Sequence, residues 1–375
     1  MTHPLAGIKV ADFSRVLAGP LATMTLADLG ASVIKVERPG LGDDTRQWGP
    51  PWTAHSSSYF ECVNRSKQSV ALDLSDPGDL RIAKALIAES DVMVENFLTG
   101  TLDRLGLGYD AMAALNPQLI YCSITGFGSG LGASKPGYDF VVQAVGGLMS
   151  ISGFPEGPPT KTGVALVDVL TGKDATIAVL AALHERATSG LGQRVEVNLL
   201  SSLLGSLVNQ TSATLTTGTA PTRMGNKHPS IAPYETFQCG PDTLAIACGN
   251  DTQFARLAAA LERPELAGDE RFATNPSRVA NRPALVEALE AALAARSIVE
   301  WTALLDAAGV PAGPVNDIVA AIGLARDLGL DPTIDVGESQ QIRHPITWSR
   351  SDLPAPTPPP TLGEHTADIR SRFKE

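Results

Sequence analysis

The sequence predicts an α/β protein whose main part is a parallel sheet covered by helices on both faces. Three observations lead to this fold class. In the first half of the chain, short apolar segments typical of strands alternate with longer segments of helical periodicity. After residue 205 the composition changes, and a second, smaller group of strands and helices follows. The length of 375 residues is sufficient for two domains or one large one.

The first half contains strand patterns separated by helical ones. Helices are predicted at residues 19–30, where Pro20 suits the first turn and Gly30 the end, and at residues 76–91, where apolar side chains share one face. In chain order, the strands are expected at residues 8–13, 31–37 and 69–74 and in the segments DVMVENF (91–97) and LIYCSITGFG (119–128). Strands separated by helices indicate parallel pairing.

The second half begins with a segment at 209–233 that is rich in Thr, Ser, Gly and Pro, which indicates a linker or an active-site loop. A pair of strands follows, YETFQ and TLAIACG, joined by the turn CGPD. Helices are expected at 251–262, 283–296 and 298–308, and again near Glu364 or Thr366 in a tail that starts proline-rich at 353.

Composition excludes several classes of function. With 43% hydrophobic and 18% charged residues, the chain is typical of a soluble globular protein. A net charge of -11 argues against a nucleic-acid partner, although local basic residues can still hold an anionic ligand. No apolar run approaches the ~18 residues that span a bilayer, and no signal peptide is visible, so we expect a cytoplasmic protein without a membrane partner. The four cysteines lack metal-ligand spacing, which predicts reduced thiols and no metal site.

A single carboxylate, Asp168, interrupts the apolar segment GVALVDVLTGKDATIAVLAAL (163–183). Burying a carboxylate without partners is costly, so this residue either caps a helix or takes part in chemistry. A cap fits the helical pattern that runs to about Ser189 and ends at Gly190. The same place also favours a carboxylate that attacks a carbonyl, because a helix N-terminus stabilises the anion. The spacing leaves both interpretations open.

Basic residues near predicted strand ends are candidates for holding a phosphorylated ligand, because open α/β sheets bind ligands there. The four candidates are Arg38, Arg65, Lys67 and Arg104. The glycine-rich segment GFGSGLG (126–132) also follows a strand, but Pro136 argues against the helix that a dinucleotide fingerprint requires. This segment is more typical of a flexible loop beside a ligand. No histidine has a Ser or Cys partner in a triad pattern.

Seven segments carry a family pattern: PLAGIKVADFSRVLAGP, LGASVIKVERPGLGDDTR, DVMVENFLTGTLDRLG, KPGYDFVVQAVGGLMSISG, GVALVDVLTG, GVPAGPVND and PPPTLGEHT. In this order, and over nearly the whole chain, they resemble the family III CoA-transferases, which include formyl-CoA transferase, carnitine CoA-transferase and α-methylacyl-CoA racemase. The segment GNKHPSIAPYETF further resembles the branch that moves CoA between succinate and glutarate-type acids.

The resemblance implies a role for specific side chains. Asp168 matches the family's nucleophile. The residues that match coenzyme A contacts are Val16, Arg38, Leu72, Asn96, Phe97, Arg104 and, more loosely, Lys135. The expected contacts to the acid substrate are Trp48, Tyr138, Asp139, Arg223 and His228. Coenzyme A thioesters and carboxylic acids are therefore the implied substrates, with no permanently bound cofactor and no metal.

The resemblance also implies a large Rossmann-like domain, a smaller α+β domain and a homodimer of interlocked chains. The large domain is expected at 1–205 and a linker or active-site loop at 206–232. The small domain is expected at 233–325, and a C-terminal segment at 326–375 is expected to return to the large domain.

In the implied mechanism, Asp168 attacks an acyl-CoA thioester to give a mixed anhydride, which CoA thiolate converts into an aspartyl-CoA thioester. A dicarboxylyl-CoA such as succinyl-CoA is the expected donor, because Arg223 and His228 offer partners for a second carboxylate. Two alternatives stay open: a racemase or epimerase, which has a His where this chain has Tyr138, and a CoA-binding protein without catalysis. The segment MGNKHPS replaces the glycine-rich lid of formyl-CoA transferase, which argues against oxalate and formyl-CoA.

Overall fold

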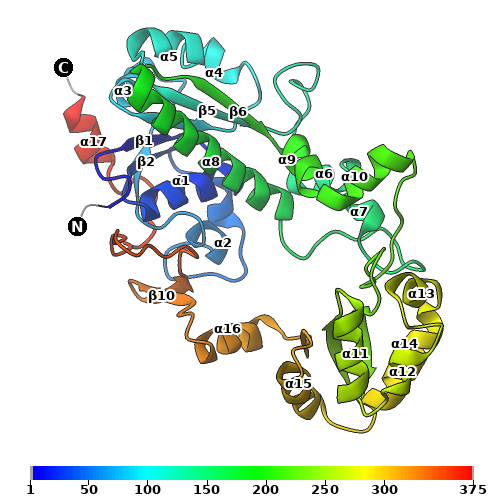
Figure 1. Cartoon of the computed structure of the whole chain (residues 1–375). Helices are drawn as coiled ribbons and strands as arrows, with labels where there is room; N and C mark the ends of the chain where they lie inside the picture. The colour runs from blue at the N-terminus through cyan, green and yellow to red at the C-terminus, as the bar shows by residue number, and fades with distance from the viewer. Residues whose placement is uncertain (1–2, 374–375) are drawn as a thin grey trace. The chain divides into compact units, whose positions relative to one another are not determined.

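A parallel six-stranded sheet forms the core of the larger of two compact units (Figure 1). In the computed structural model, which describes residues 3–373, the strand order is β3-β2-β1-β4-β5-β6. The strands are β1 (Lys9–Asp12), β2 (Ser32–Glu37), β3 (Lys67–Ala71), β4 (Val92–Glu95), β5 (Ile120–Thr125) and β6 (Arg194–Asn198). The predicted α/β class with a parallel sheet is confirmed. Successive strands are added on one side of β1 as far as β3, and from β4 onward on its other side. Such a switch point opens a crevice at the carboxyl ends of the strands.

Strand β6 was absent from the predicted set. Its sequence, RVEVN, has two apolar residues, and none of its residues is fully buried. A short edge strand of this kind carries almost no apolar signal, so its place is determined by pairing with β5 rather than by its own pattern.

Helices cover both faces of the sheet. Helices α1 (Ala18–Asp28) and α8 (Leu166–Ser189) pack against each other on one face, and α3 (Pro77–Ala88) and α5 (Tyr109–Leu115) lie on the other (Figure 1). Asp76 caps α3 with its side chain, and the proline at its first turn is pre-organised for a helix. The helices predicted at 19–30 and 76–91 correspond to α1 and α3, and the helical pattern predicted to run to about Ser189 corresponds to α8.

Shorter helices connect these elements: the 3-10 helix η1 (Asp44–Gln47), α2 (Ser58–Glu61), α4 (Thr101–Arg104), α6 (Asp139–Val145), α7 (Leu148–Ile151), α9 (Leu199–Ser206) and α10 (Val208–Thr217). Helix α10 occupies the first part of the segment predicted as a linker or loop. Its threonines are tolerated because their hydroxyls bond the carbonyl one turn earlier, as in Thr214 to Gln210 (2.8 Å) and Thr217 to Ala213 (2.8 Å).

The C-terminal segment protects the exposed edge of the sheet at β3. Helix α17 (Thr366–Arg372) contacts β3 and lies beside the N-terminal strands in Figure 1. The backbone N–H of Ser69 donates to Nδ1 of His365 (3.3 Å), and that of Ala71 donates to Oγ1 of Thr366 (2.9 Å). Side chains from the tail thus satisfy backbone groups of an edge strand that would otherwise be open for pairing. The predicted helix near Thr366 is confirmed.

The larger unit comprises the residues up to Leu148, Lys161–Thr219 and those from Asp331 onward, including the hairpin β10 (Thr333–Val336) and β11 (Ser339–Ile342). The smaller unit comprises Met149–Thr160 and Ala220–Leu330. Its antiparallel sheet has the order β7 (Tyr234–Cys239), β8 (Asp242–Ala247) and β9 (Ala312–Pro314). Its helices are α11 (Asp251–Ala260), α12 (Glu265–Gly268), α13 (Asn275–Ala280), α14 (Arg282–Leu293), α15 (Ile298–Ala307) and α16 (Ile318–Asp327). The predicted strand pair and its turn are confirmed.

Candidate active site

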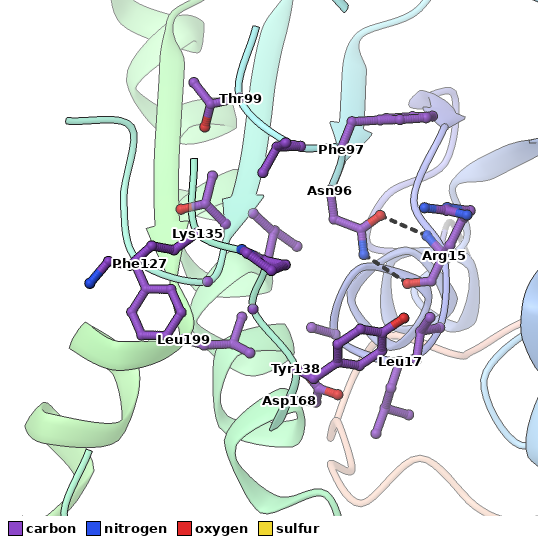
Figure 2. A pocket seen from close by; sticks show the side chains of 18 of the residues that line it. Arg15, Leu17, Asn96, Phe97, Thr99, Phe127, Lys135, Tyr138, Asp168 and Leu199 are labelled. Atoms are coloured by element: carbon purple, nitrogen blue, oxygen red, sulfur yellow. Dashed lines mark hydrogen bonds between the residues drawn. The ribbon is translucent and has the colours of Figure 1, made fainter. Parts of the chain in front are cut away.

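A cavity of about 590 Å³ opens at the carboxyl ends of β1, β4 and β5 in the larger unit (Figure 2). This is the place at which an open parallel sheet offers a crevice, because β1 and β4 are neighbours at the switch point. Seven of the predicted site residues line it: Val16, Trp48, Asn96, Phe97, Lys135, Tyr138 and Asp168. An eighth, Asp139, adjoins Tyr138 at the start of α6 but does not line the cavity.

Asp168 lies in the first turn of α8 and is half-buried at the cavity. The close packing of α8 on α1 fixes this turn, because a Cβ at Gly172 would lie 2.7 Å from the carbonyl oxygen of Ala18. Within residues 3–373, no group donates a hydrogen bond to the Asp168 carboxylate. Asp168 is therefore held in place by the helix while its carboxylate stays available to a ligand.

A different carboxylate caps α8. Oδ1 of Asp139 accepts hydrogen bonds from the backbone N–H groups of Val167 (2.8 Å) and Asp168 (3.2 Å). Oδ2 of Asp139 accepts from the side-chain amide of Gln143 (2.7 Å), so both oxygens are engaged. The interpretation of Asp168 as a simple cap is wrong, because Asp139 supplies that function from α6. Asp139 is nearly fully buried and acts on the site through the position and charge that it imposes on Asp168.

The electrostatics of Asp168 follow from this arrangement. Burial, and next the negative charge of Asp139, raise the pKa of Asp168 to about 7. A carboxyl with such a pKa changes its charge near neutral pH, and a strongly perturbed group in a cavity is a typical mark of a functional site.

Aromatic side chains lie near this carboxylate. Trp48 and Tyr59 meet edge to face with their ring centroids 5.3 Å apart. Burial, and next the charge of Asp168, raise the pKa of Tyr59 to about 12, so its hydroxyl stays protonated beside the carboxylate. Tyr138 also lines the cavity, with 59% of its surface exposed. No motif in the sequence marks Tyr59, which is recognised by its ring contact with Trp48 and by the effect of the Asp168 charge on its pKa.

Side chains from separate elements hold the backbone that follows β1. Asn96 accepts from the backbone N–H of Arg15 (2.9 Å) and donates to its carbonyl (2.8 Å), as the dashed lines in Figure 2 show. Both oxygens of Asp43 lie 3.3 Å from the backbone nitrogen of Val16, and Lys35 donates to the carbonyl of Ser14 (2.8 Å). Val16 has a φ of 71°, which is strained for a β-branched residue and needs such external support. Asn96, predicted as a ligand contact, therefore has its carboxamide committed to this turn.

Buried ion pairs lie beneath the turn. Nζ of Lys67 is 3.0 Å from Asp12, and Nζ of Lys35 is 2.9 Å from Asp43, with all four side chains fully buried. Burial opposes the charged form of Asp12, but Lys67, Lys35 and two hydroxyls outweigh it and lower the pKa of Asp12 to about 2. Lys67 is thus a structural residue, and the hypothesis that it holds a phosphorylated ligand is wrong.

Arg65, which was also predicted to hold a phosphorylated ligand, instead binds other residues of the protein. Its guanidinium forms a two-pronged ion pair with Asp28 (2.9 and 2.6 Å) and donates to the carbonyl of Ile342 (2.9 Å). Lys67 and Arg65 therefore belong to structural interactions of the larger unit, and neither lines the cavity.

A second cavity of about 540 Å³ lies at the carboxyl ends of β2 and β3. Arg38 and Leu72, both predicted CoA contacts, line it, and Arg15 and Phe97 line both cavities. Arg104 is exposed and donates to Oγ1 of Thr101 (3.1 Å); its neighbour Leu105 lines the second cavity. The predicted contacts are therefore distributed over two adjoining cavities.

Arg223 and His228 belong to the smaller unit. The guanidinium of Arg223 donates to the carbonyls of Phe154 (3.3 Å) and Gly157 (3.0 Å), which joins the two stretches of that unit. Nδ1 of His228 accepts from the backbone N–H of Ser230 (3.1 Å), and its ring packs 5.1 Å from that of Tyr234. These contacts stabilise the unit's own loops.

In residues 3–373, no helix has the length and apolar character needed to cross a membrane. Over the same range, no three side chains among His, Cys, Asp and Glu gather in a way that suits a metal ion.

Comparison with known proteins identifies the family. The pattern of CoA-transferase family III matches residues 5–366. The chain is 42% identical to a mouse succinyl-CoA:glutarate CoA-transferase, over 98% of this chain and 85% of the relative. It is 40% identical to the acetyl-CoA:oxalate CoA-transferase of Acetobacter aceti, over 99% and 96%. The crystal structure of a CAIB/BAIF family protein from Brucella suis superposes with a TM-score of 0.90 at 44% identity, covering 100% of both chains. The chain belongs to CoA-transferase family III and is an enzyme of that family.

Proposed function

We propose that this enzyme moves coenzyme A from an acyl-CoA to a free carboxylic acid through covalent intermediates on Asp168. The observation that carries the proposal is the Asp168 carboxylate itself, which faces a cavity without a hydrogen-bonding partner in the described chain while a second carboxylate, Asp139, caps its helix. A nucleophile needs this freedom, because a carboxylate engaged by donors is a weaker one.

The proposed reaction needs no general base. The Asp168 carboxylate attacks the thioester carbonyl and expels CoA thiolate, which leaves a mixed anhydride. The thiolate then attacks the aspartyl carbonyl, forming an aspartyl-CoA thioester and releasing the first acid as its carboxylate. The acceptor carboxylate attacks this thioester, and the same two steps in reverse yield the new acyl-CoA. Carboxylate and thiolate numbers balance, and no resident cofactor is involved. Trp48, Tyr59 and Tyr138 limit access of water, which would hydrolyse the anhydride.

Coenzyme A fits the pair of adjoining cavities. In this proposal its thioester reaches Asp168 in the first cavity, and the remainder extends past Phe97 toward Arg38 and Leu72 in the second. Lys135 and Arg104 are exposed cations within reach of the phosphates. Asn96 acts on the ligand by fixing the turn at Arg15 and Val16.

Dicarboxylic acids are the proposed acyl groups and acceptors. Both named relatives, the mouse and Acetobacter enzymes, carry a dicarboxylate in their names, glutarate in one and oxalate in the other. Oxalate therefore returns as a candidate acceptor alongside glutarate. A racemase remains less well supported, because Tyr138 stands where a second acid or base is needed.

A screen of donors against acceptors tests this function. With succinyl-CoA as donor, we expect transfer to glutarate, and roughly tenfold lower kcat/KM for butyrate, since a site that pairs a second carboxylate discriminates against its loss. Formation of the new thioester is followed by liquid chromatography. Equal use of butyrate and glutarate contradicts the dicarboxylate assignment, whereas no transfer from any donor to any acid contradicts the proposed function.

The pH dependence is a further prediction. Because Asp168 attacks in its ionised form and has a pKa of about 7, kcat/KM is expected to rise with pH through that value and then level off. Asp139→Asn retains an oxygen that accepts from the α8 N–H groups but removes the negative charge, so the pKa of Asp168 falls and the rising limb moves to lower pH. Asp174→Asn, at an exposed site on the same helix, is the control. If the pH profile of kcat/KM is the same in Asp139→Asn as in the wild type, the charge of Asp139 does not raise the pKa of Asp168.

We also propose that the enzyme is a homodimer of interlocked chains. Apolar side chains on α6, α8 and α10 are exposed in the single chain, among them Val145 (63%), Ile177 (64%) and Leu215 (87%). Apolar surface of this extent is typical of an interface. A molar mass of one chain by light scattering contradicts this proposal.

A further inference from the structure

Arg15 lines both cavities, although it was not among the predicted ligand contacts. It follows β1, and it lines both the cavity that contains Asp168 and the cavity that contains Arg38. Phe97 accompanies it in both, with Cζ of Arg15 5.7 Å from the centroid of the Phe97 ring. A guanidinium at the junction of two ligand-sized spaces meets whichever part of a substrate crosses between them.

The backbone of Arg15 is unusually well fixed. Its N–H and carbonyl groups both bond to Asn96, and the neighbouring Val16 N–H points at Asp43. Asp43 is itself held by the buried Lys35. Three buried or half-buried side chains from other elements thus determine the position of this one residue, and such support is how a protein pre-organises a binding group.

The donors of Arg15 are only partly used. Nη1 forms an ion pair with Asp44 (3.0 Å), whose other oxygen pairs with Nη2 of Arg38 (3.0 Å). Two guanidinium groups therefore share a single carboxylate, which leaves one positive charge in excess in this trio. Nε of Arg15 is buried and finds no acceptor within residues 3–373. A buried donor without an acceptor is costly, and an incoming ligand that supplies one removes this cost.

We propose that Arg15, with Arg38 beyond it, binds an oxygen anion of the substrates at the junction of the two cavities. This inference rests on the proposed function and names a residue that selects its substrates. A guanidinium matches phosphate and carboxylate oxygens through parallel N–H donors. The CoA phosphates and the second carboxylate of a dicarboxylic acid both provide such oxygens. Asp44 keeps the two guanidinium groups oriented until one of these anions binds.

The test compares Arg15→Gln and Arg15→Lys with Arg194→Gln. Arg194 is a matched control in the same sheet, because its side chain is 40% exposed and paired with Glu196, and that of Arg15 is 38% exposed and paired with Asp44. One arm measures KM for succinyl-CoA and for succinyl-pantetheine, which lacks the phosphates. The other measures KM for glutarate and for butyrate. Thermal melting accompanies each variant, and Arg15→Lys retains the charge if Arg15→Gln fails to fold.

If the anion is a CoA phosphate, Arg15→Gln is expected to raise KM about tenfold for succinyl-CoA and little for succinyl-pantetheine. If the anion is a substrate carboxylate, the same rise in KM is expected for glutarate, with little change for butyrate. Either result supports the proposal and identifies the source, with Arg15→Lys intermediate because it lacks the fork of donors. Values within twofold of Arg194→Gln in both arms overturn it. Calorimetric titration of Arg15→Gln and wild type with CoA and with glutarate needs no turnover, so the anion site is judged separately if the proposed transfer fails.

Discussion

Replacement of Asp168 by asparagine is expected to lower the turnover number by roughly 10⁴-fold or more, as losses of a covalent nucleophile do. Asparagine keeps the shape of the side chain and the hydrogen bond from the Asp168 backbone to Asp139, so the fold and the affinity for CoA should change little. A neutral amide cannot form the anhydride, which confines the loss to chemistry. The measurement is the initial rate of thioester exchange at pH 8, where the wild-type carboxylate is largely ionised.

Trapping gives this prediction a second readout. Wild-type enzyme incubated with an acyl-CoA and hydroxylamine should carry a hydroxamate on the peptide that contains Asp168, detected by mass spectrometry. Asp174→Asn, exposed on the same helix, should label and turn over as wild type does. Ordinary turnover by Asp168→Asn, or a label on another residue, contradicts the assigned nucleophile.

The second large effect concerns stability. Lys67→Met is expected to lower the free energy of unfolding by about 3–5 kcal/mol, because it leaves the carboxylate of Asp12 fully buried without its ion-pair partner. The same change removes the donor to Asn64 (2.8 Å) and to the carbonyl of Pro20 (3.0 Å). Urea unfolding followed by circular dichroism measures the difference.

Two controls separate burial of charge from loss of a lysine. Lys9→Met, at an exposed position on β1, should change the free energy of unfolding by less than about 0.5 kcal/mol. The double variant Asp12→Leu with Lys67→Met should recover part of the loss, since an apolar pair of similar volume often replaces a buried ion pair without great cost. If Lys67→Met is as mild as Lys9→Met, the ion pair contributes little to stability.

The sequence was informative wherever local pattern determines structure. Strands β2, β4 and β5 contain short apolar runs, and Pro20 and Pro77 suit the first turns of α1 and α3. Prediction from the sequence failed where a partner far along the chain determines the local structure. The start of β3 was expected at residue 69, two residues late, which left Lys67 in a presumed loop, while in the sheet it points into the protein toward Asp12.

The same reason limited the prediction of the site. The sequence left Asp168 open to capping as well as to attack, and the capping contact is seen to come from Asp139, on another helix, only in the folded structure. The sequence alone does not distinguish the roles of Arg15 and Arg65. One lies between two cavities with a free donor, and the other is consumed by Asp28 and Ile342. Burial and pairing across the sheet distinguish them, and neither is visible in a local segment.

The hydrogen bonds between the tail and β3 have a consequence for how the protein is made. The backbone of Ala71 finds its acceptor on Thr366, 295 residues later. During synthesis all six strands of the sheet, and all of the smaller unit, therefore emerge from the ribosome before the residues that close this edge. Until then the nascent chain presents an open strand to its neighbours on the same messenger, and the larger unit reaches its final form only after the segment around Thr366 has emerged.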